Sequence, residues 1–331
     1  CRAKLRPLPL TLTLSPGGEG TGCAHPQGGG TGSTHLKEIL TNRRLRAVAA
    51  VGLVTAGIWA YALISRPRLL SVTVMDVGEG LSMVVRSPSG RTLVMDCGTC
   101  SWRDNESVGE SVVVPYLQGM GVDHIDVAVL SHPHADHVSG YPGLIRAMPP
   151  SLVLDIGTRS RSPLYKRFLA AIKRAKARYR IARRGQNIDL GDGVRALVLN
   201  PKPGNPYSDL NERSIVLRVT YKHTSFLLAA DTGEETEQEM IKSRMPVRAQ
   251  VLQVGHHGSA DSSSSEWLAA VRPAIAVISC GRRNQYGHPA RETLARLRST
   301  GARIYRTDRN GAVCLTSDGE SISALSIVDQ R

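Results

Sequence analysis

Four side chains of the kind that bind metal ions stand within six residues, in the segment His132-Pro-His134-Ala-Asp136-His137. The segment directly follows an apolar run at residues 125–130 that is typical of a buried strand. Imidazole nitrogens and carboxylate oxygens suit zinc and manganese. Ligands this close together on one loop can face two neighbouring ions. The sequence therefore predicts one or two divalent ions, with His132 and His134 on one and Asp136 and His137 on the other.

Two later segments place further ligand types after predicted strands. Asp231 ends a predicted strand at residues 224–230, and His256 and His257 follow an apolar run at residues 250–254. Taken alone, Asp231 caps a strand about as often as it binds a metal. Adjacent histidines at the end of an apolar run are rarely both structural, so at least one is expected to coordinate an ion.

Four more polar residues are candidates with two interpretations each. His288 is predicted either to fix a loop or to act as a proton donor or phosphate contact, supported by Asn284. Asp76 and Asp96 end predicted strands. They either orient ligating histidines through the second ring nitrogen or cap turns.

The elements that must position these residues alternate between strands and helices. Strands are predicted at residues 70–75, 83–86, 92–95, 125–130, 214–221, 224–230, 250–254, 274–279, 303–307, 312–316 and 321–326, and helices at residues 112–119, 141–147, 165–180 and 291–299. Mixed strands with interleaved helices favour an α/β fold of αββα type, with two mixed β-sheets flanked by helices. The ligand-bearing loops would then lie at one edge of the sheets.

The composition is that of a folded protein with a basic excess. Apolar residues make up 41% of the 331 residues, and the formal net charge is +14. Residues 1–70 carry nine Lys and Arg against two acids, and the rest carries 33 against 26, so each part contributes +7. This charge permits a nucleic-acid partner without requiring one. Residues 159–184 carry eleven basic and no acidic side chains, which predicts a solvated helix face or a phosphate-tracking surface.

The N-terminal part differs in composition from the rest. Residues 1–42 are rich in Gly, Pro, Thr and Ser and are predicted to be disordered. Residues 47–64 form an uncharged run flanked by arginines, about 27 Å long as a helix, which predicts a transmembrane anchor over 45–66. The arginines before it favour a single-pass protein of the cell membrane with its folded domain outside. The alternatives for this run are a buried core helix and the core of a signal peptide. A buried core helix would make the protein a soluble cytoplasmic enzyme.

The six cysteines are too few and too scattered for a disulfide scaffold or a Cys-rich zinc site. Cys97 and Cys100 have CxxC spacing, but no thioredoxin-like βαβ pattern surrounds them. They are predicted to be small loop residues or a local disulfide rather than a redox pair.

Residues 132–137 match the HxHxDH signature and so resemble the metallo-β-lactamase superfamily. More narrowly, residues 71–327 resemble the soluble hydrolase domain of ComEC-type competence proteins, which take up transforming DNA. The matching segments are Met75-Asp-Val-Gly-Glu-Gly80, Val94-Met-Asp-Cys-Gly98, Pro115-Tyr-Leu117, Asn211-Glu-Arg-Ser214, Leu227-Leu-Ala-Ala-Asp231, Val254-Gly-His-His-Gly-Ser259, Asn284-Gln-Tyr-Gly-His-Pro289 and Tyr305-Arg-Thr-Asp308. The resemblance implies a metallo-β-lactamase domain over residues 70–331 with zinc or manganese. The many-helix channel of ComEC proteins is not part of this sequence, so a separate channel protein is a candidate partner.

The resemblance also implies roles for single residues. Asp231 is expected to bridge two ions, His256 is favoured as a ligand, and His257 is expected to serve the second ion or the leaving group. Where superfamily enzymes usually have a further histidine, this sequence offers Asn211 and Ser214. Substrate contacts are expected from Asn211, Ser214, Ser259, Asn284 and His288, and catalytic roles from Asp136, His257 and His288. A departure is Leu81, which stands where the family commonly has aspartate.

The sequence therefore predicts a metal-dependent hydrolase. A water molecule activated by the metal would attack a phosphodiester, and DNA is the substrate that the resemblance implies. A phosphorylcholine-esterase or lactonase-like hydrolase of small or surface esters is one alternative, and it would have a narrow apolar pocket. A non-catalytic DNA-binding uptake component is the other, although the intact ligand motif argues against it.

Overall fold

The computed structural model describes residues 43–64, 69–99, 108–204, 207–282 and 284–328. By its contacts the chain forms two compact units, residues 1–66 and 67–331. The described part of the first unit is a 22-residue helix, α2 (Arg43–Ile64), with arginines in its first turn and many alanines after them. No helix among these residues is long and apolar enough to cross a membrane, so the membrane-spanning helix predicted over 45–66 is not supported. The tail predicted at residues 1–42 lies outside the described residues.

The second unit is built around two mixed β-sheets. The first sheet has eight strands, which in spatial order are β15 (Ile322–Ser326), β14 (Val313–Ser317), β1 (Leu70–Val74), β2 (Ser82–Arg86), β3 (Thr92–Cys97), β4 (Ile125–Val129), β5 (Pro150–Asp155) and β6 (Arg178–Ile181). Neighbours are antiparallel from β15 to β3 and parallel from β3 to β6.

The second sheet has seven strands. In spatial order they are β13 (Arg303–Arg306), β12 (Ile275–Ile278), β11 (Val251–Gln253), β10 (Thr224–Leu228), β9 (Val216–Tyr221), β8 (Arg195–Asn200) and β7 (Asn187–Asp189). Strands β10 to β13 are parallel, and β7 to β10 are antiparallel. The predicted hairpin of β9 and β10 is confirmed by their register.

The sheets face each other across one apolar core. Val72 and Met83 of the first sheet and Phe226 and Leu228 of the second are each at most 1% exposed and belong to it. Successive side chains of a strand point to opposite faces, so the alternate residues are free to pack against helices. Burying each large apolar side chain contributes about 1.5–3 kcal/mol.

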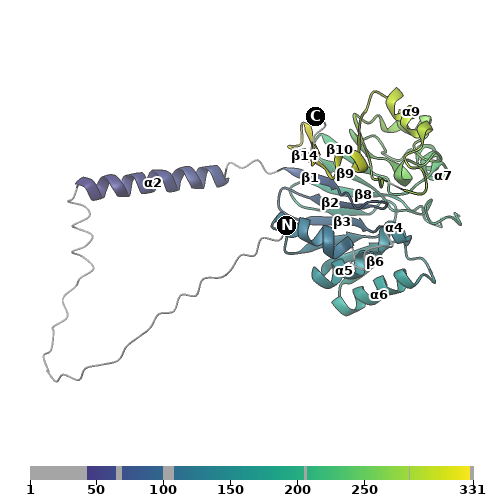
Figure 1. The fold of residues 1–331 in the computed structure, drawn as a ribbon, viewed down its shortest axis with the longest axis horizontal. Coiled ribbons are helices and arrows are strands. Elements are labelled where there is room, and N and C mark those ends of the chain that lie inside the picture. The colour runs from purple at the N-terminus through teal and green to yellow at the C-terminus, as the bar shows by residue number, and fades with distance from the viewer. Residues whose placement is uncertain (1–42, 65–68, 100–107, 205–206, 283, 329–331) are drawn as a thin grey trace, which may run out of the picture. The chain divides into compact units, whose positions relative to one another are not determined.

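Helices cover the outer face of each sheet, with α5 and α6 on one side and α7 and α9 on the other (Figure 1). The first sheet is covered by the π-helical turn η1 (Gly109–Val113), α3 (Val114–Gly119), α5 (Tyr141–Ala147) and α6 (Pro163–Ala175), and the second by α7 (Glu234–Lys242), α8 (Ser265–Val271) and α9 (Arg291–Ser299). The short helices α4 (Ala135–Val138) and α10 (Thr307–Asn310) and the 3-10 turn η2 (Gly255–Gly258) follow strands. This is the predicted αββα arrangement.

The helix predicted over residues 165–180 is wrong at its end. Helix α6 stops at Ala175 because Lys176 adopts a left-handed conformation, with φ 53°, and its N–H caps the last turn. The next residues form β6, the edge strand of the first sheet. One of its side chains, Tyr179, donates a hydrogen bond to Asp155 Oδ2 on the neighbouring strand at 2.9 Å. The basic stretch is therefore two elements, a helix and an edge strand.

The polar loops follow the carboxyl ends of parallel strands. Strand β4 leads into residues 131–137, β10 leads to Asp231, β11 leads to η2, and β12 leads to Ser279. Parallel strands point the same way, so their carboxyl ends share one edge of each sheet. Cys97, at the end of β3, is a buried free thiol, whereas Cys100 lies outside the described residues.

Candidate metal centre

Four of the predicted ligand residues bring their side chains to one point. Asp136 and His137 lie on α4, Asp231 follows β10, and His257 lies in η2. One ligand atom from each lies within 4.8 Å of the others. His137 Nε2 lies 3.0 Å from Asp231 Oδ2, and His257 Nε2 lies 3.3 Å from Asp136 Oδ2 and 3.5 Å from Asp231 Oδ2. Two imidazoles and two carboxylates can hold a divalent cation such as zinc or manganese.

The other two histidines of the motif loop lie beside this cluster. His132 Nε2 is 2.9 Å from His134 Nδ1 and 3.9 Å from Asp231 Oδ2. The two rings meet edge to face, with their centroids 4.5 Å apart. Asp231 thus faces both groups of histidines and could be shared between two ions.

Hydrogen bonds on the far side of two rings fix their orientation. Asp96 Oδ2 accepts the Nδ1–H of His137 at 2.9 Å, and its Oδ1 accepts the backbone N–H of Ser131 at 2.7 Å. The Nδ1–H of His257 donates to the carbonyl oxygen of Ser279 at 2.9 Å. Because Nδ1 of each ring holds its proton on the outer side, Nε2 is the nitrogen that faces the cluster and is available to a metal ion.

Buried carboxylates dominate the electrostatics of the cluster. Burial alone would lower the pKa of His137 and of His257, but the negative charges of Asp231 and Asp136 outweigh it and raise both pKa values well above the usual range. Burial would raise the pKa of both aspartates, yet the histidines hold it below the usual range. His132 differs, because burial and the neighbouring His137 lower its pKa and keep the ring neutral, as a ligand must be.

Two buried atoms of the cluster have no hydrogen-bond partner within the part of the chain that the structure describes. They are His137 Nε2 and Asp231 Oδ1. A buried polar atom left unpaired costs about 1–3 kcal/mol. A divalent cation at this point would satisfy both atoms and offset the charge of the two carboxylates. The residues present therefore fit a bound metal ion.

The structure distinguishes the two adjacent histidines of η2. His257 belongs to the cluster, whereas His256 is paired elsewhere. The Nε2 of His256 accepts a hydrogen bond from Asn211 Nδ2 at 3.3 Å, and its Nδ1 lies 3.4 Å from Asp261 Oδ1. This geometry favours His257 over His256 as a metal ligand, the reverse of the predicted preference. Both residues have left-handed backbone, with φ 46° and 53°, a strain of about 1–2 kcal/mol each that is typical of functional sites.

The cluster opens on a cleft of about 380 Å³. Its lining residues are Glu79, His134, Ala135, Asp136, Asp231, His256, His257, Gln285, Tyr286 and His288. Most of them are polar or charged, and they come from loops of both sheets. The cleft therefore offers a polar substrate direct access to the metal-ligand residues.

Asn284, predicted to contact the substrate, forms hydrogen bonds that position a neighbouring histidine. Its Nδ2 donates to the carbonyl oxygens of Gly281 at 2.9 Å and His288 at 2.6 Å, and its Oδ1 accepts the N–H of His288 at 2.8 Å. His288 lines the cleft and stacks on Tyr286 with ring centroids 5.7 Å apart. Burial and the nearby His256 lower the pKa of His288, so its ring is neutral.

A carboxyl group that the sequence did not single out also lines the cleft. Glu79 Oε2 accepts the backbone N–H of Gly281 at 2.9 Å, and burial raises the pKa of this carboxyl. The signal for it was the Gly-rich turn that precedes Leu81. Leu81 itself is fully buried in the core, and its N–H donates to the carbonyl oxygen of Asp136 at 3.0 Å. The departure from the family at this position therefore lies outside the cleft.

Two serines that were predicted to contact the substrate form hydrogen bonds within the metal site. Ser214 is fully buried, and its Oγ lies 3.2 Å from Nδ1 of His132, which it helps to orient. Ser259 donates its N–H to the carbonyl oxygen of His256 at 2.8 Å and is not among the described residues that line the cleft. Both serines hold metal-site histidines or their loops.

The two aspartates at strand ends behave differently. Asp96 is fully buried and contacts a ligand histidine, as described above. Asp76 is exposed, and its Oδ1 accepts the backbone N–H of Gly78 at 3.3 Å in a turn. Asp76 therefore caps a turn in this structure, which is one of its two predicted roles.

Comparisons with known proteins agree with this geometry. A family model described as the metallo-beta-lactamase superfamily matches residues 75–282. The chain is 33% identical over 253 residues to ComE operon protein 3 of Bacillus subtilis, which covers 73% of this chain and 32% of that protein. It is 33% identical over 244 residues to competence protein ComA of Neisseria gonorrhoeae, with coverage of 73% and 32%. The chain thus spans about a third of the length of these relatives.

A solved structure shares the architecture. The metallo-beta-lactamase fold protein YhfI from Bacillus subtilis superposes with a TM-score of 0.53 at 12% identity and covers 75% of this chain and 99% of its own. At this identity the likeness concerns the fold alone. The fold, the ligand motif and the family match together show that this chain belongs to the metallo-β-lactamase superfamily.

Proposed function

We propose that this chain is a metal-dependent phosphodiesterase that cleaves DNA. The observation that carries the proposal is the convergence of Asp136, His137, Asp231 and His257 within 4.8 Å beside a polar cleft. Buried ionisable groups with strongly shifted pKa values gather at functional sites far more often than elsewhere.

The ligand residues divide into two groups that share one carboxylate. Asp136, His137, Asp231 and His257 would hold one ion, and His132 and His134 together with Asp231 would hold a second, zinc or manganese in each case. A bound divalent ion lowers the pKa of water and offsets negative charge on phosphoryl oxygens. The buried Asp96 and the carbonyl of Ser279 keep two of the histidines in the tautomer that this requires.

The wall of the cleft supplies a group for the substrate. His288 is neutral and faces the cleft, so its ring N–H can donate to a phosphoryl or leaving-group oxygen. Asn284 fixes the backbone of His288 through three hydrogen bonds. We propose that His288 contacts the reacting phosphate and that Asn284 is a positioning residue.

The lining of the cleft supports a phosphodiester over a small apolar ester. Ala135 is the single aliphatic side chain among the described residues that line it. The resemblance to ComEC-type competence proteins, which take up transforming DNA, supports DNA as the polymer. The convergence of Asp136, His137, Asp231 and His257 beside an open cleft supports an enzyme over a DNA-binding component whose metal is structural.

The test is cleavage of single- and double-stranded DNA by the purified chain, with zinc or manganese added after dialysis against a chelator. The small diester bis-p-nitrophenyl phosphate is assayed alongside. Asp136→Ala removes a proposed ligand, and His223→Ala removes an exposed histidine of the β9–β10 turn as a matched control.

We expect metal-dependent cleavage of DNA by the wild type and the control, and a loss of at least about a hundredfold in Asp136→Ala, as for other groups that act on the reacting atoms. Cleavage of the small diester alone would keep the hydrolase and exclude the nuclease. No hydrolysis by folded, metal-loaded protein would leave the binding component as the better explanation.

A further inference from the structure

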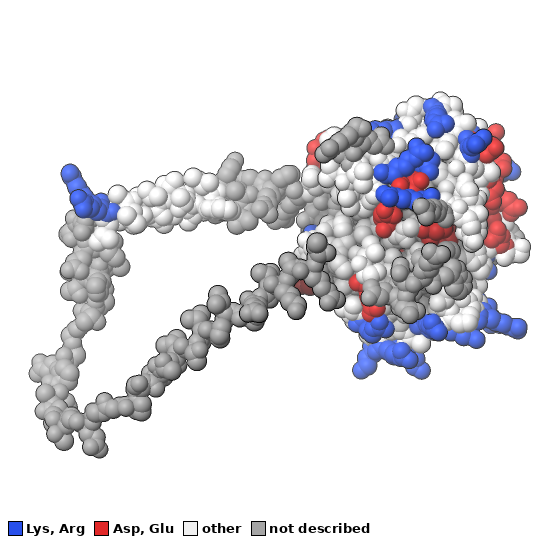
Figure 2. Space-filling model, viewed as in Figure 1, with Lys and Arg blue, Asp and Glu red and all other residues white. Residues whose placement is uncertain are grey.

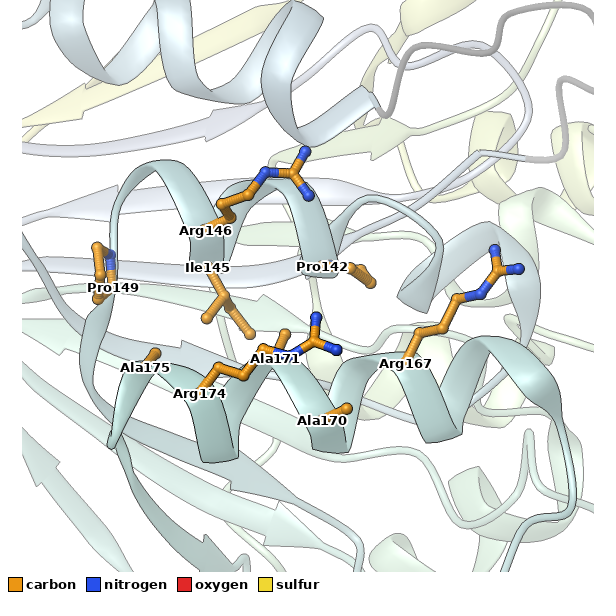
Figure 3. Close-up of a pocket in the computed structure, with 9 residues that line it drawn as sticks. All are labelled: Pro142, Ile145, Arg146, Pro149, Arg167, Ala170, Ala171, Arg174 and Ala175. Carbon is orange, nitrogen blue, oxygen red and sulfur yellow. The ribbon is translucent and has the colours of Figure 1, made fainter.

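A second hollow lies between α5 and α6, apart from the metal-ligand cleft. It has a volume of about 630 Å³ and is lined by Pro142, Ile145, Arg146, Pro149, Arg167, Ala170, Ala171, Arg174 and Ala175 (Figure 3). Its floor is apolar, where Ile145 of α5 points toward Ala171 of α6. Its charged groups are three arginines and no acid, which is the chemistry of a site for an anion with an apolar part.

Two of these arginines are available to a ligand. Arg167 and Arg174 are exposed, extend from α6 toward α5, and make no ion pair with any described residue (Figure 3). Arg146 instead pairs with Glu110. Residues 159–184 hold no acid, and Lys and Arg gather along the lower edge of the folded unit, where α6 lies (Figure 2).

The spacing of the two free arginines fits a phosphodiester backbone. Arg167 and Arg174 are seven residues apart, or about 10 Å along the helix axis. Along the axis of a duplex this separation corresponds to about three nucleotide steps, at about 3.4 Å for each step, so the two side chains can reach different phosphates of one strand. The apolar floor between the helices can pack against sugars or bases.

The groove begins close to the metal-ligand residues. Pro142, at one end of it, follows His137 by five residues, and α4 contacts α6. Strands β4 and β5 are parallel, so the loop after β5, which holds Arg159 and Arg161, lies at the same sheet edge as residues 131–137. The basic surface therefore leads from the groove toward the cleft.

The cleft by itself is poorly suited to capture a polyanion. None of the described residues that line it is a lysine or an arginine, so it has no permanently charged side chain to hold the phosphates on either side of the scissile bond. A basic surface outside the cleft attracts the polymer over a longer range and raises the rate of association.

We propose that the α5–α6 groove binds the phosphodiester backbone of the nucleic acid whose scissile bond enters the cleft. The inference rests on the proposed function and adds the surface that holds the polymer. Arg167 and Arg174 would each contact a phosphate, and the contacts would be independent of base sequence.

The test measures binding in the absence of metal, so it does not depend on catalysis. Fluorescence anisotropy of a labelled 20-nucleotide single strand is recorded with the full-length chain in chelator, over a series of salt concentrations. Arg167→Gln/Arg174→Gln removes the two charges. Arg272→Gln/Arg298→Gln removes two exposed arginines at the ends of α8 and α9, which cover the other sheet.

We expect the groove variant to bind about tenfold more weakly and its salt slope to fall by about 1.4, at about 0.7 for each lost contact on a single strand. The α8–α9 variant is expected to match the wild type. Equal affinities for the groove variant and the wild type, or equal losses in both variants, would overturn the proposal. The proposal is also overturned if the groove variant loses binding to phosphatidylserine vesicles but binds DNA as the wild type does, because the groove would then bind a lipid surface. If the groove variant alone loses DNA binding but the wild type cleaves no DNA with metal, the proposed function fails and the groove remains a surface that binds nucleic acid.

Discussion

The Nε2 of His137 lies 3.0 Å from Oδ2 of Asp231, although the two residues follow strands of different sheets. His137 lies on α4 after β4 of the first sheet, and Asp231 lies after β10 of the second. The metal centre is thus formed where the ends of the two sheets meet. Neither sheet holds the complete ligand set, so the site depends on the packing of the whole domain.

Asp231 is expected to be the residue on which metal binding depends most. Asp231→Asn keeps the shape of the side chain but removes the charge that faces three histidines. We expect zinc affinity to fall by at least about a hundredfold. Replacing a residue that only forms a hydrogen bond to a metal ligand already lowers metal affinity by about 10–100-fold. Calorimetric titration of metal-free protein measures this, with Asp123→Asn in an exposed loop as the control. Unchanged affinity would remove Asp231 from the ligand set.

Asp96 is expected to act through His137. Asp96→Asn keeps an amide oxygen for the N–H of Ser131, but its amide nitrogen takes the place of Oδ2 and cannot accept the Nδ1–H of His137. Asparagine tolerates the left-handed backbone of this position, φ 59°, so no new strain arises. We expect about 10–100-fold weaker metal binding and about 1–3 kcal/mol lower stability in chelator. Calorimetry and urea unfolding measure the two effects, and a stability loss with intact metal affinity would mean that Asp96 is only structural.

The two adjacent histidines are expected to differ in metal binding. His257→Gln removes a nitrogen that lies 3.3 Å from Asp136 and 3.5 Å from Asp231. His256→Gln instead removes a ring whose Nε2 contacts Asn211 and whose Nδ1 contacts Asp261. The amount of zinc retained after dialysis, measured by mass spectrometry, should fall in the first variant and stay near the wild type in the second. The opposite order would restore the preference that the sequence predicted.

Glu237 is expected to make the stability of the domain depend on pH. It is 1% exposed, its Oε1 and Oε2 accept the N–H groups of Ser263 and Ser264 at 2.5 and 2.9 Å, and burial raises its pKa from 4.5 to about 7. Because the pKa of Glu237 is higher in the folded state, this group contributes its full stabilisation below pH 4.5. That contribution is lost as the pH rises through about 7. The free energy of unfolding is expected to fall by about 3 kcal/mol over this pH range through the titration of Glu237.

Urea unfolding of the wild type and of Glu237→Gln between pH 4.5 and 8 tests this. The variant lacks the titrating group, so the difference in unfolding free energy between the two proteins should change with pH by that amount. Other titrating groups, including those of the metal centre, are common to both and cancel. A difference that stays constant across this range would show that the two backbone N–H groups keep the carboxylate ionised throughout.

The sequence by itself determined the elements and residues that depend on near neighbours. The apolar run before residues 131–137, the β9–β10 hairpin and helix α9 follow from alternation, turn residues and helical spacing. The motif His132 to His137 identifies a metal site because four ligand types in six residues need no distant partner to be recognised. The αββα layering followed from the order of those elements.

Only the tertiary structure decided how the loops use their polar groups. His257 rather than His256 faces the cluster because packing of η2 gives both residues left-handed backbone, which no local pattern predicts. Glu79 reaches the cleft because the N–H of Gly281, 202 residues away, holds its carboxylate. Helix α6 ends at Ala175 with Lys176 in the left-handed conformation, and pairing with β5 extends the chain from Arg178 onward. Side-chain identities state which chemistry is available, whereas contacts between distant segments select which atoms carry it out.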